Sequence, residues 1–376
     1  MQQIAMAWLA YRLTHSALVL GLLGFASQLP ILLFGALGGV WSDRVDRRHL
    51  MLWTQSAALL QALLLAWLTW RGWITPELLL ALGFLMGCIN AVDMPARQSL
   101  VVHLVDDRAQ LANAIALNSF LMNSTRFVGP ALAGWIIAQV GESLCFLLNA
   151  LSYLAVLLAL WALHARPKGD ASAPAWRALN EGLRYTFNHA DIRLFLVLVA
   201  SISFFVTPYV VMMPLYAKTI FHGDAQTFGL LVSSAGAGSL LASLFLASRT
   251  SVEGLARRVS LAATVAGVAL ALFALNSVHA LAYPILMLLG FCLVLIAAGS
   301  NTLLQTWLRD DMRGRVMALF SMAFLGIAPL GSLAVGSLAS GIGIRPALFL
   351  CGVLTIAAGL VHNHRLGIRL HPSLSR

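Results

Sequence analysis

Residues 17–48, which decide the fold, read ALVLGLLGFASQLPILLFGALGGVWSDRVDRR. From Ala17 to Trp41 the stretch carries no charged side chain. An α-helix of that length rises about 37 Å, which is enough to cross the ~30 Å hydrocarbon core of a bilayer. The charged cluster from Asp43 to Arg48 then marks the point where the chain returns to water. The stretch therefore predicts a membrane-spanning helix followed by a short polar loop.

The composition of the whole chain agrees with this local reading. Hydrophobic residues make up 60% of the 376 residues and charged residues only 10%, whereas a soluble domain carries about 25% charged residues. The apolar runs show no alternation of period two, which disfavours a membrane β-barrel. Because backbone groups inside lipid must satisfy one another, the remaining solution is a bundle of α-helices. We therefore expect an all-α membrane protein.

Twelve membrane-spanning helices are expected. They lie at residues 1–13, 17–41, 50–70, 76–94, 113–140, 144–163, 192–216, 227–246, 255–275, 281–302, 316–339 and 345–362. The first is short: thirteen residues rise about 20 Å, which is two-thirds of the hydrocarbon thickness. This length predicts that an N-terminal stretch is missing.

The twelve spans divide into two sets of six. Residues 1–163 are expected to form one six-helix bundle, and residues 192–376 a second bundle with a short tail. In the linker, 164–191, four apolar residues at spacings of three and four predict an interfacial amphipathic helix. These are Trp176, Leu179, Leu183 and Phe187. Weak echoes between the halves, such as Gly129-Pro130 and Ala328-Pro329, favour two pseudo-symmetric bundles, an arrangement typical of transporters.

The formal charge of +10 does not indicate nucleic-acid binding, because the basic residues are scattered over short loops instead of forming one stripe. Alternate loops are rich in Arg. The opposite set of loops holds only Arg12, Arg71, Lys218 and Arg345. By the positive-inside rule, the linker and the C-terminus are expected to be cytoplasmic, in a multi-pass protein of the inner (plasma) membrane.

The loop from Gly39 to Arg48, Gly-Val-Trp-Ser-Asp-Arg-Val-Asp-Arg-Arg, resembles the signature loop of the major facilitator superfamily, Gly-x-x-x-Asp-Arg-x-Gly-Arg-Arg. Asp46 replaces its second glycine. Residues 94–98, Met-Pro-Ala-Arg-Gln, and residues 113–118 resemble its transmembrane secretion effector branch, which is enterobactin exporter-like. The resemblance implies the major facilitator fold. It also implies proton-coupled efflux of a small amphipathic molecule, such as a siderophore or a drug, by alternating access.

The same resemblance implies a conformational switch at the cytoplasmic end of the first bundle. Asp43 and Arg47 lie four residues apart and can pair, and Asp93 can complete a charge triad. In the family, the residue matching Asp43 also faces the N-terminus of the eleventh span. We expect these contacts to hold the halves together on the cytoplasmic side, with Gly39 and Arg44 as part of the switch. The alternative is that the arginines only bind lipid headgroups.

Arg126 is expected near the middle of the membrane, where an unpaired cation costs at least about 2.5–3.5 kcal/mol. Asn118, Met122 and Arg126 recur every four residues and share one helix face. This face is expected to line the substrate cavity and to attract anions or couple to protons. The alternative is a structural salt bridge. The resemblance implies an acidic partner ahead of Met1.

Other candidates are less specific. Gln28 in the second span, and Phe204 and Tyr209 in the seventh, are expected either to line an amphipathic pocket or to pack against lipid and neighbouring helices. Gly129, Pro130 and Gly134 resemble part of the family's antiporter motif. Pro130 predicts a bend in the fifth span, and these three residues are expected to form a helix hinge.

The sequence holds no Walker loop, no His-Glu-x-x-His and no Gly-x-Ser-x-Gly, so no catalytic residues, metal site or cofactor are expected. The expected partners are a small-molecule substrate, protons or another coupling ion, and the lipid bilayer, with the protein as a monomer. A polytopic membrane enzyme and a non-transporting sensor or scaffold are the alternatives. Uptake or efflux in proteoliposomes separates a transporter from both.

Overall fold

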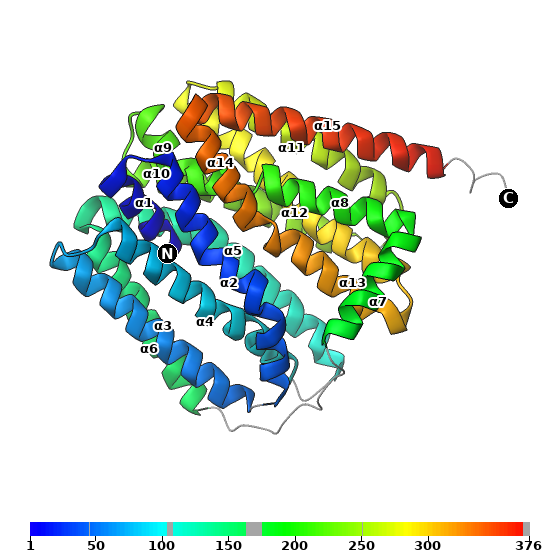
Figure 1. Ribbon diagram of the computed structural model, residues 1–376, viewed down its shortest axis with the longest axis horizontal. Coiled ribbons are helices and arrows are strands. Elements are labelled where there is room, and N and C mark those ends of the chain that lie inside the picture. Colours follow the sequence, from blue (N-terminus) through cyan, green and yellow to red (C-terminus); the bar gives the residue numbers. More distant parts are fainter. Residues whose placement is uncertain (45, 104–107, 163–174, 250, 371–376) are drawn as a thin grey trace.

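The computed structural model describes residues 1–44, 46–103, 108–162, 175–249 and 251–370. Within that part of the chain, side chains are not described at 36–44, 47, 98–103, 108–120, 123, 175–180, 182, 310–311 and 368–370. Every element in the described ranges is helical (Figure 1). This confirms the predicted all-α class.

The helices before the linker form the first helix group. They are α1 (Gln2–Thr14), α2 (Ala17–Arg44), α3 (Arg47–Trp70), α4 (Pro76–His103), α5 (Arg108–Val140) and α6 (Glu142–Ala162). Helix α2 packs along α4, and α3 packs along α6 and α4. The short helix α1 touches α2, α4, α5 and α6, so it lies inside this group.

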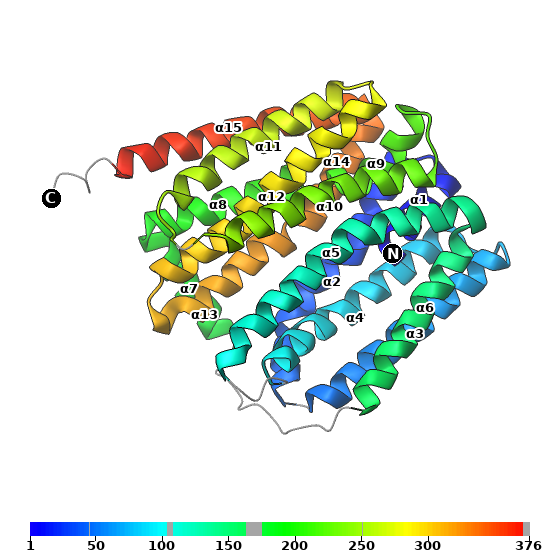
Figure 2. The same cartoon turned by 180° about the vertical axis from the view of Figure 1, so that it is seen from behind.

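The second helix group follows α7 (Ala175–Asn188), the helix of the linker. It contains α8 (Ala190–Phe205), α9 (Tyr209–Thr219), α10 (Ala225–Ala247), α11 (Leu255–Leu275), α12 (His279–Trp307), α13 (Asp310–Ser321), the π-helical turn η1 (Met322–Gly326), α14 (Ala328–Ile342) and α15 (Ile344–Leu370). Helix α11 packs along α15 and α12, and α10 packs along α12. Figures 1 and 2 show the two groups side by side, with their helices running roughly in one direction.

Ten segments of the described chain are long and apolar enough to cross a membrane. In that count α8 with α9 forms one segment, Ala190–Thr219, and α13 to α14 forms another, Met312–Ile342. Helix α1 has 13 residues and α5 has 33; they stand where the first and fifth of the twelve expected spans were placed.

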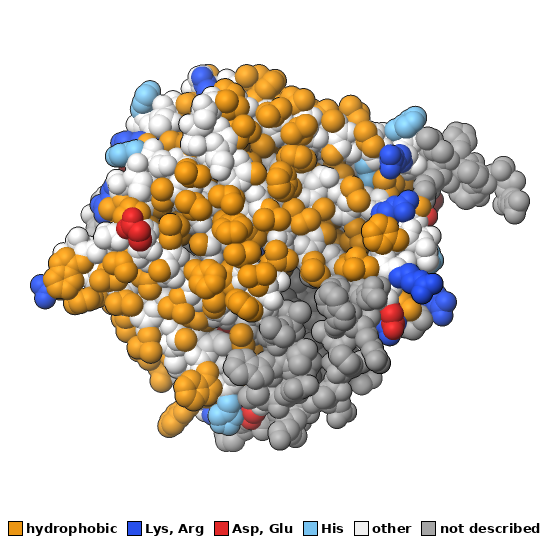
Figure 3. Space-filling model, in the orientation of Figure 1, with side chains coloured by type: hydrophobic (Ala, Val, Ile, Leu, Met, Phe, Trp, Pro, Cys, Tyr) orange, Lys and Arg blue, Asp and Glu red, His pale blue; other side chains and the backbone are white. Residues whose placement is uncertain are grey.

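The surface has the character expected of a protein in lipid. Large apolar side chains such as Trp53, Leu158 and Trp161 are exposed on helices of the first group. Figure 3 shows one face covered by hydrophobic side chains, with Lys, Arg, Asp and Glu gathered near its margins. So large an apolar surface is rare on a soluble monomer, whereas lipid tails solvate it well.

Two spans that the sequence predicted as continuous helices are interrupted. The seventh breaks between Phe205 and Tyr209. Pro208 has no N–H, and the Thr207 N–H bonds back to the Ile202 carbonyl (3.2 Å), so the helical ladder stops there. The eleventh span contains η1, a π-helical turn of five residues. Single π-turns inside α-helices are frequent at functional positions.

Helix α7 forms where the linker pattern predicted a helix. Its apolar residues Leu183 and Phe187 are exposed, the latter by 64%. On the polar side, Glu181 forms an ion pair with Arg315 of α13, with 2.5 Å between Oε2 and Nη1. Because α7 also packs against α13, the linker helix is joined to the second group through the start of the eleventh span.

Candidate functional site: the seam between the two helix groups

The first contact across the seam joins α2 to α14 through glycines. A β-carbon placed on Gly336 would lie 2.7 Å from the α-carbon of Gly21, and one on Gly21 would lie 2.6 Å from the carbonyl oxygen of Ser332. A β-carbon on Gly24, one turn further along α2, would lie 3.0 Å from the Ser332 β-carbon. No larger residue fits at Gly21 or Gly336 without moving a backbone, because real side chains do not approach so closely.

The second contact joins α5 to α10 and has the same chemistry. A β-carbon on Gly134 would lie 2.9 Å from the α-carbon of Gly229, and one on Gly229 would lie 2.5 Å from the Pro130 carbonyl oxygen. Further along, Gly236 lies against the backbone of Arg126. The Ser233 hydroxyl donates to the Phe127 carbonyl at 2.6 Å, which adds a hydrogen bond across the seam.

These contacts concentrate toward the end of the molecule remote from α7. Gly21 lies near the start of α2, and Gly134 and Gly229 lie near the corresponding ends of α5 and α10. Gly336 lies just past the middle of α14. Small residues let helix backbones approach closely in lipid. A seam of glycine backbones, with a single neutral hydrogen bond among the described contacts of α5 with α10, can separate without leaving a buried charge unpaired.

Asp93 of α4 lies at the other end of the first group, in a buried polar cluster. Its Oδ1 accepts from the Thr54 hydroxyl (2.7 Å) and from the Gln55 amide (2.7 Å), both on α3. Its Oδ2 accepts from Arg97, one turn further along α4, at 2.6 Å. The carboxylate is only 3% exposed. Donors from Thr54, Gln55 and Arg97 thus occupy both carboxylate oxygens.

The other residues of the predicted switch lie where side chains are not described. Gly39, Asp43 and Arg44 belong to the end of α2, and Arg47 begins α3, so the triad with Asp93 stays a prediction. The described cation on Asp93 is Arg97. Thr54 lies about 10 Å along the α3 axis from Arg47, so Arg47 reaches Asp93 only if its side chain lies along α3.

Asp46, which replaces a glycine of the signature loop, caps α3. Its Oδ1 accepts from the Arg48 backbone N–H at 2.8 Å, and its Oδ2 lies 3.1 Å from the His49 ring. Burial raises the pKa of Asp46, but the hydrogen bonds from Arg48 and His49 outweigh it and hold the pKa below its usual range. The Asp46 φ of −56° needs no glycine.

The Arg48 side chain caps the C-terminal end of α6. Its Nε donates to the Leu160 carbonyl (2.9 Å) and its Nη2 to the Trp161 carbonyl (2.7 Å). These are carbonyls of the last helical turn, which have no partner within the helix. The signature loop therefore ties α3 to the end of α6.

Arg126 stands at the seam, with its backbone against Gly236 of α10 and its side chain exposed. Among the side chains that the structure describes, none forms an ion pair or hydrogen bond with its guanidinium. Met122, one turn away, is 48% exposed. Asn118 lies outside the described side chains. Gln28 is half-buried, and its amide donates to the Gly24 carbonyl of its own helix at 3.4 Å.

Phe204 and Tyr209 flank the break between α8 and α9. Phe204 is half-buried and packs edge-on against Phe205, with ring centroids 5.1 Å apart. Tyr209 is 2% exposed, so its ring is out of reach of a ligand in this conformation. Beside them, the buried Ser203 hydroxyl donates to the Phe324 carbonyl in η1 at 2.5 Å. The two interrupted spans are thus bonded to each other at their interruptions.

The predicted hinge residues take different positions. Helix α5 continues as a helix through Pro130, which is buried. A β-carbon on Gly129 would meet no atom within 4 Å, whereas Gly134 is a seam residue. The hinge role of Gly129 and Pro130 stays a prediction.

The sequence analysis missed a buried polar chain inside the first group. The Gln2 amide donates to Gln61 (2.6 Å), and the Asn149 amide donates to Gln2 (2.8 Å). Gln61 in turn donates to the Leu82 carbonyl at 3.1 Å. The signal was present, because amide side chains in apolar helices find polar partners on other helices. Which helices would meet was not visible.

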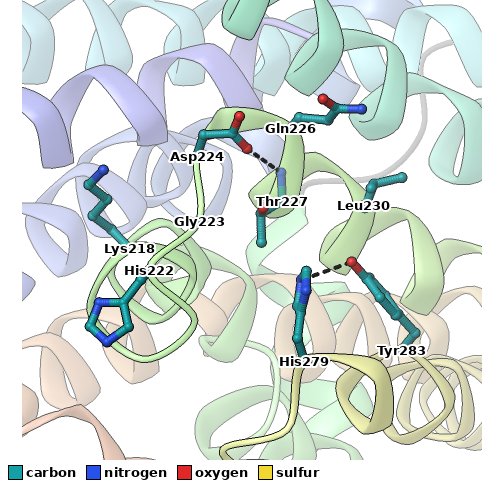
Figure 4. A pocket seen from close by; sticks show the side chains of 9 residues that line it. All are labelled: Lys218, His222, Gly223, Asp224, Gln226, Thr227, Leu230, His279 and Tyr283. Atoms are coloured by element: carbon teal, nitrogen blue, oxygen red, sulfur yellow. Dashed lines mark hydrogen bonds between the residues drawn. The ribbon is translucent and has the colours of Figure 1, made fainter.

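Figure 4 shows a hollow at the end of the second group remote from α7. Lys218 lies in the last turn of α9, His222 and Asp224 lie between α9 and α10, and His279 and Tyr283 begin α12. Asp224 accepts from the Thr227 backbone N–H at 2.9 Å, and the Tyr283 hydroxyl lies 2.9 Å from the His279 Nε2. All of its lining residues belong to the second group.

Curated relatives span nearly the whole chain. The staphyloferrin A transporter of Staphylococcus aureus is 26% identical over 378 aligned residues, covering 99% of this chain and 94% of that protein. The MFS-type transporter YfiS of Bacillus subtilis is 25% identical and covers 94% and 85%. The multidrug efflux pump Tap of Mycobacterium tuberculosis is 24% identical and covers 95% and 87%.

Solved structures share the fold at low identity. The nucleoside transporter NupG, in a D323A mutant, superposes with a TM-score of 0.74 at 12% identity, over 96% of this chain and 94% of that one. A bacterial homologue of the human lysosomal transporter Spinster, inward-facing and unoccupied, gives 0.70 at 14% identity, with the same coverage. These likenesses confirm the major facilitator fold.

One family model matches nearly the whole chain and identifies its family. The transmembrane secretion effector family matches residues 1–373, and its curated relatives are transporters and not enzymes, which excludes the membrane enzyme alternative. The chain belongs to the transmembrane secretion effector family of the major facilitator superfamily and is a multi-pass membrane transporter.

Proposed function

We propose that this transporter exports a small amphipathic organic molecule by proton-coupled alternating access. The observation that carries the proposal is the seam, in which two glycine contacts, α2 with α14 and α5 with α10, close the same end of the molecule. Such an arrangement suits two bodies that rock about a central site. The names of the relatives, a siderophore transporter and a multidrug efflux pump, support an amphipathic substrate.

The two bodies are proposed to be residues 1–163 and 192–376, with residues 164–191 as the cytoplasmic linker between them. The distribution of Lys and Arg supports this orientation. In it, the closed end of the seam faces outward. Cysteines introduced at Gly169 and Ser373 should resist impermeant thiol reagents in intact cells. Labelling of both from outside would reverse the orientation.

Arg126 is proposed to contact the substrate or its coupling ion. Its guanidinium stands in the membrane with no described partner, and Met122 lies on the same face of α5. A charge left unpaired at this depth is costly and is usually functional. Arg126→Ala should abolish transport while leaving protein folding intact, and Arg126→Lys should restore part of it. Equal transport by Arg126→Ala and the parent protein would remove the residue from the mechanism.

The cytoplasmic latch of Asp43, Arg47 and Asp93, with Gly39 and Arg44, is proposed as the switch that closes the opposite end. The Asp93 cluster supports it, because the Asp93 carboxylate is already held where α3 and α4 meet. Asp43→Asn should cut transport strongly with normal protein levels in the membrane. Transport at the parental rate would show that the loop arginines serve only as anchors.

Transport in proteoliposomes tests the whole proposal. A pH gradient imposed across the membrane should drive uptake of a fluorescent amphipathic drug into vesicles that contain the protein inside-out. Collapse of the gradient with a protonophore should abolish that uptake. Uptake that persists without the gradient would contradict proton coupling, and no uptake of siderophores or drugs in a broad screen would contradict the substrate class.

A further inference from the structure

A second cavity lies over the closed end of the seam, and residues from both helix groups line it. Its volume is about 620 Å³. One wall is the turn between α1 and α2, at His15, Ser16 and Ala17. The other wall includes Thr219 of α9, Ser340 of α14 and Arg345 of α15. In Figures 1 and 2 the α1–α2 turn lies close to α9 and to the beginning of α15.

The cavity touches the glycine seam directly. A β-carbon on Gly336 would lie 2.9 Å from the Ala17 carbonyl oxygen, and Ser340 is one helical turn beyond Gly336. The distance between the two walls is therefore set by the α2–α14 contact. The hollow of Figure 4 differs in this respect, because a single helix group lines it.

The lining of the cavity carries one permanent positive charge, on Arg345. Arg345 donates to two neutral oxygens, the Asn276 carbonyl (3.0 Å) and the Ser277 hydroxyl. His15, held at a φ of +50°, is exposed. None of the described residues that line the cavity is acidic. Glu142, a buried carboxylate at the start of α6, is paired with Arg12 at 3.2 Å.

Apart from the hydroxyl residues Ser16, Thr219 and Ser340, the rest of the lining is apolar, with Leu215, Ile220 and Ile344 among its residues. An apolar wall with a few polar groups that fix orientation is the usual composition of a small-molecule site. We propose that this cavity binds a small amphipathic organic anion, with its apolar body against the helices and its anionic group toward Arg345 and His15. An Arg–anion contact is the strong, charge-assisted kind of hydrogen bond.

Binding there should favour the conformation with the seam closed. A ligand shifts an equilibrium by its differential affinity for the two states, and separating α2 from α14 would pull the two walls apart. An occupied cavity should therefore slow the transport cycle. This consequence rests on the proposed alternating access, whereas the binding itself does not.

Protection from alkylation tests the binding without any transport measurement. Ser340→Cys is made in the full chain, purified in detergent micelles, and treated with N-ethylmaleimide; the parent protein gives the background from its own four cysteines. The probe is naphthalene-2-sulfonate, and its neutral analogue naphthalene-2-sulfonamide is the matched control. The sulfonate should slow alkylation of Ser340→Cys. It should not slow alkylation of Gln226→Cys in the Figure 4 hollow.

The charge requirement and the seam requirement are tested separately. Arg345→Gln should raise the half-protecting concentration about tenfold, the loss expected for a charge-assisted hydrogen bond. Arg345→Lys and His15→Gln should each raise it less. Equal protection by sulfonate and sulfonamide, or no protection, would overturn the anion site. Gly336→Leu should abolish protection; if protection persists there, the link to the seam is wrong.

A last comparison identifies the source of the natural ligand. If proteoliposomes accumulate labelled naphthalene-2-sulfonate, the cavity is an exit subsite for transported anions. If they do not, but the sulfonate slows transport of a drug, the cavity is regulatory. Drug transport that is unchanged while Ser340→Cys is fully protected would overturn the proposed effect on the cycle. Because protection is measured in micelles, failure of the anion site and failure of the transport proposal are distinguishable.

Discussion

Gly21 of α2 and Gly336 of α14 lie back to back across the seam, so that a β-carbon on Gly336 would lie 2.7 Å from the Gly21 α-carbon. The atoms nearest to each of these glycines belong to the backbone, which cannot move aside as a flexible side chain does. The α5–α10 contact, with Gly134 against Gly229, repeats this arrangement. Two such contacts make closure of this end sensitive to single methyl groups.

Gly336→Leu should therefore push the seam open. Overpacking of a tight contact costs about 1–3 kcal/mol, which is roughly a 5- to 150-fold shift between the closed and open states. Ser332→Cys, buried at the seam, should be alkylated correspondingly faster in the Gly336→Leu background. Gly341→Leu is the control, because a side chain there meets no atom within 4 Å. Unchanged alkylation in Gly336→Leu would mean that the contact does not set the closed state.

Asp93→Asn should destabilise the first helix group. The amide can no longer accept from Thr54, Gln55 and Arg97 together, and a buried donor without an acceptor costs about 1–3 kcal/mol. The measurement is the apparent Tm in detergent. Arg97→Gln should lower Tm less, because the Arg97 side chain is 51% exposed and water screens its loss. Equal effects of the two substitutions would contradict this assignment.

Ser203→Ala should loosen the π-helical turn. The substitution removes the hydrogen bond from Ser203 to the Phe324 carbonyl, worth about 0.5–1.5 kcal/mol. Hydrogen–deuterium exchange of residues 322–327 should accelerate several-fold, and the transport rate should change with it. Ser201→Ala is the matched control, since the Ser201 hydroxyl bonds only within α8, to the Val197 carbonyl. Exchange that is equal in both variants would show that the two interruptions are independent.

Asp46→Ala should lower Tm at neutral pH by removing the cap of α3, a loss of about 0.5–2 kcal/mol. Because the pKa of Asp46 is lowered in the folded protein, its charge stabilises the fold above the ordinary aspartate range, and this contribution is lost as pH falls through the lowered pKa. The Tm difference between parent and Asp46→Ala should therefore be full at pH 7 and shrink at pH 3. Asp46→Asn should lower Tm less than Asp46→Ala, because asparagine can also cap a helix. A Tm difference that grows as the pH falls would contradict the stabilising role of the Asp46 charge.

Much of the fold could be predicted because the bilayer acts on local sequence. Any run of about twenty apolar residues becomes a spanning helix whatever its neighbours are. The break at Pro208 has a local cause, a residue with no N–H, although the sequence analysis predicted an uninterrupted span there. The turn η1 has no such signal: Met322 to Gly326 includes no proline, and its π geometry accompanies packing against α8 and α2.

The candidate site was less predictable. Asp93 was identified as part of a charged cluster, but its described cation is Arg97, one turn away on the same helix. Gly134 was singled out as a hinge residue, and it lies at the seam against Gly229. Ser203, Gly21 and Gly336 were not singled out, because a serine or glycine in an apolar helix has many ordinary roles.

The solvent of this protein, the places of its apolar segments and its family could be predicted from the amino-acid sequence, since they depend on apolar run length and on a contiguous motif. Only the tertiary structure decided which glycines meet. Gly21 and Gly336 come from opposite ends of the chain, and van der Waals contact between backbones leaves no pattern along either helix. Closure of the seam, and the cavity that both groups form above it, arise from that packing.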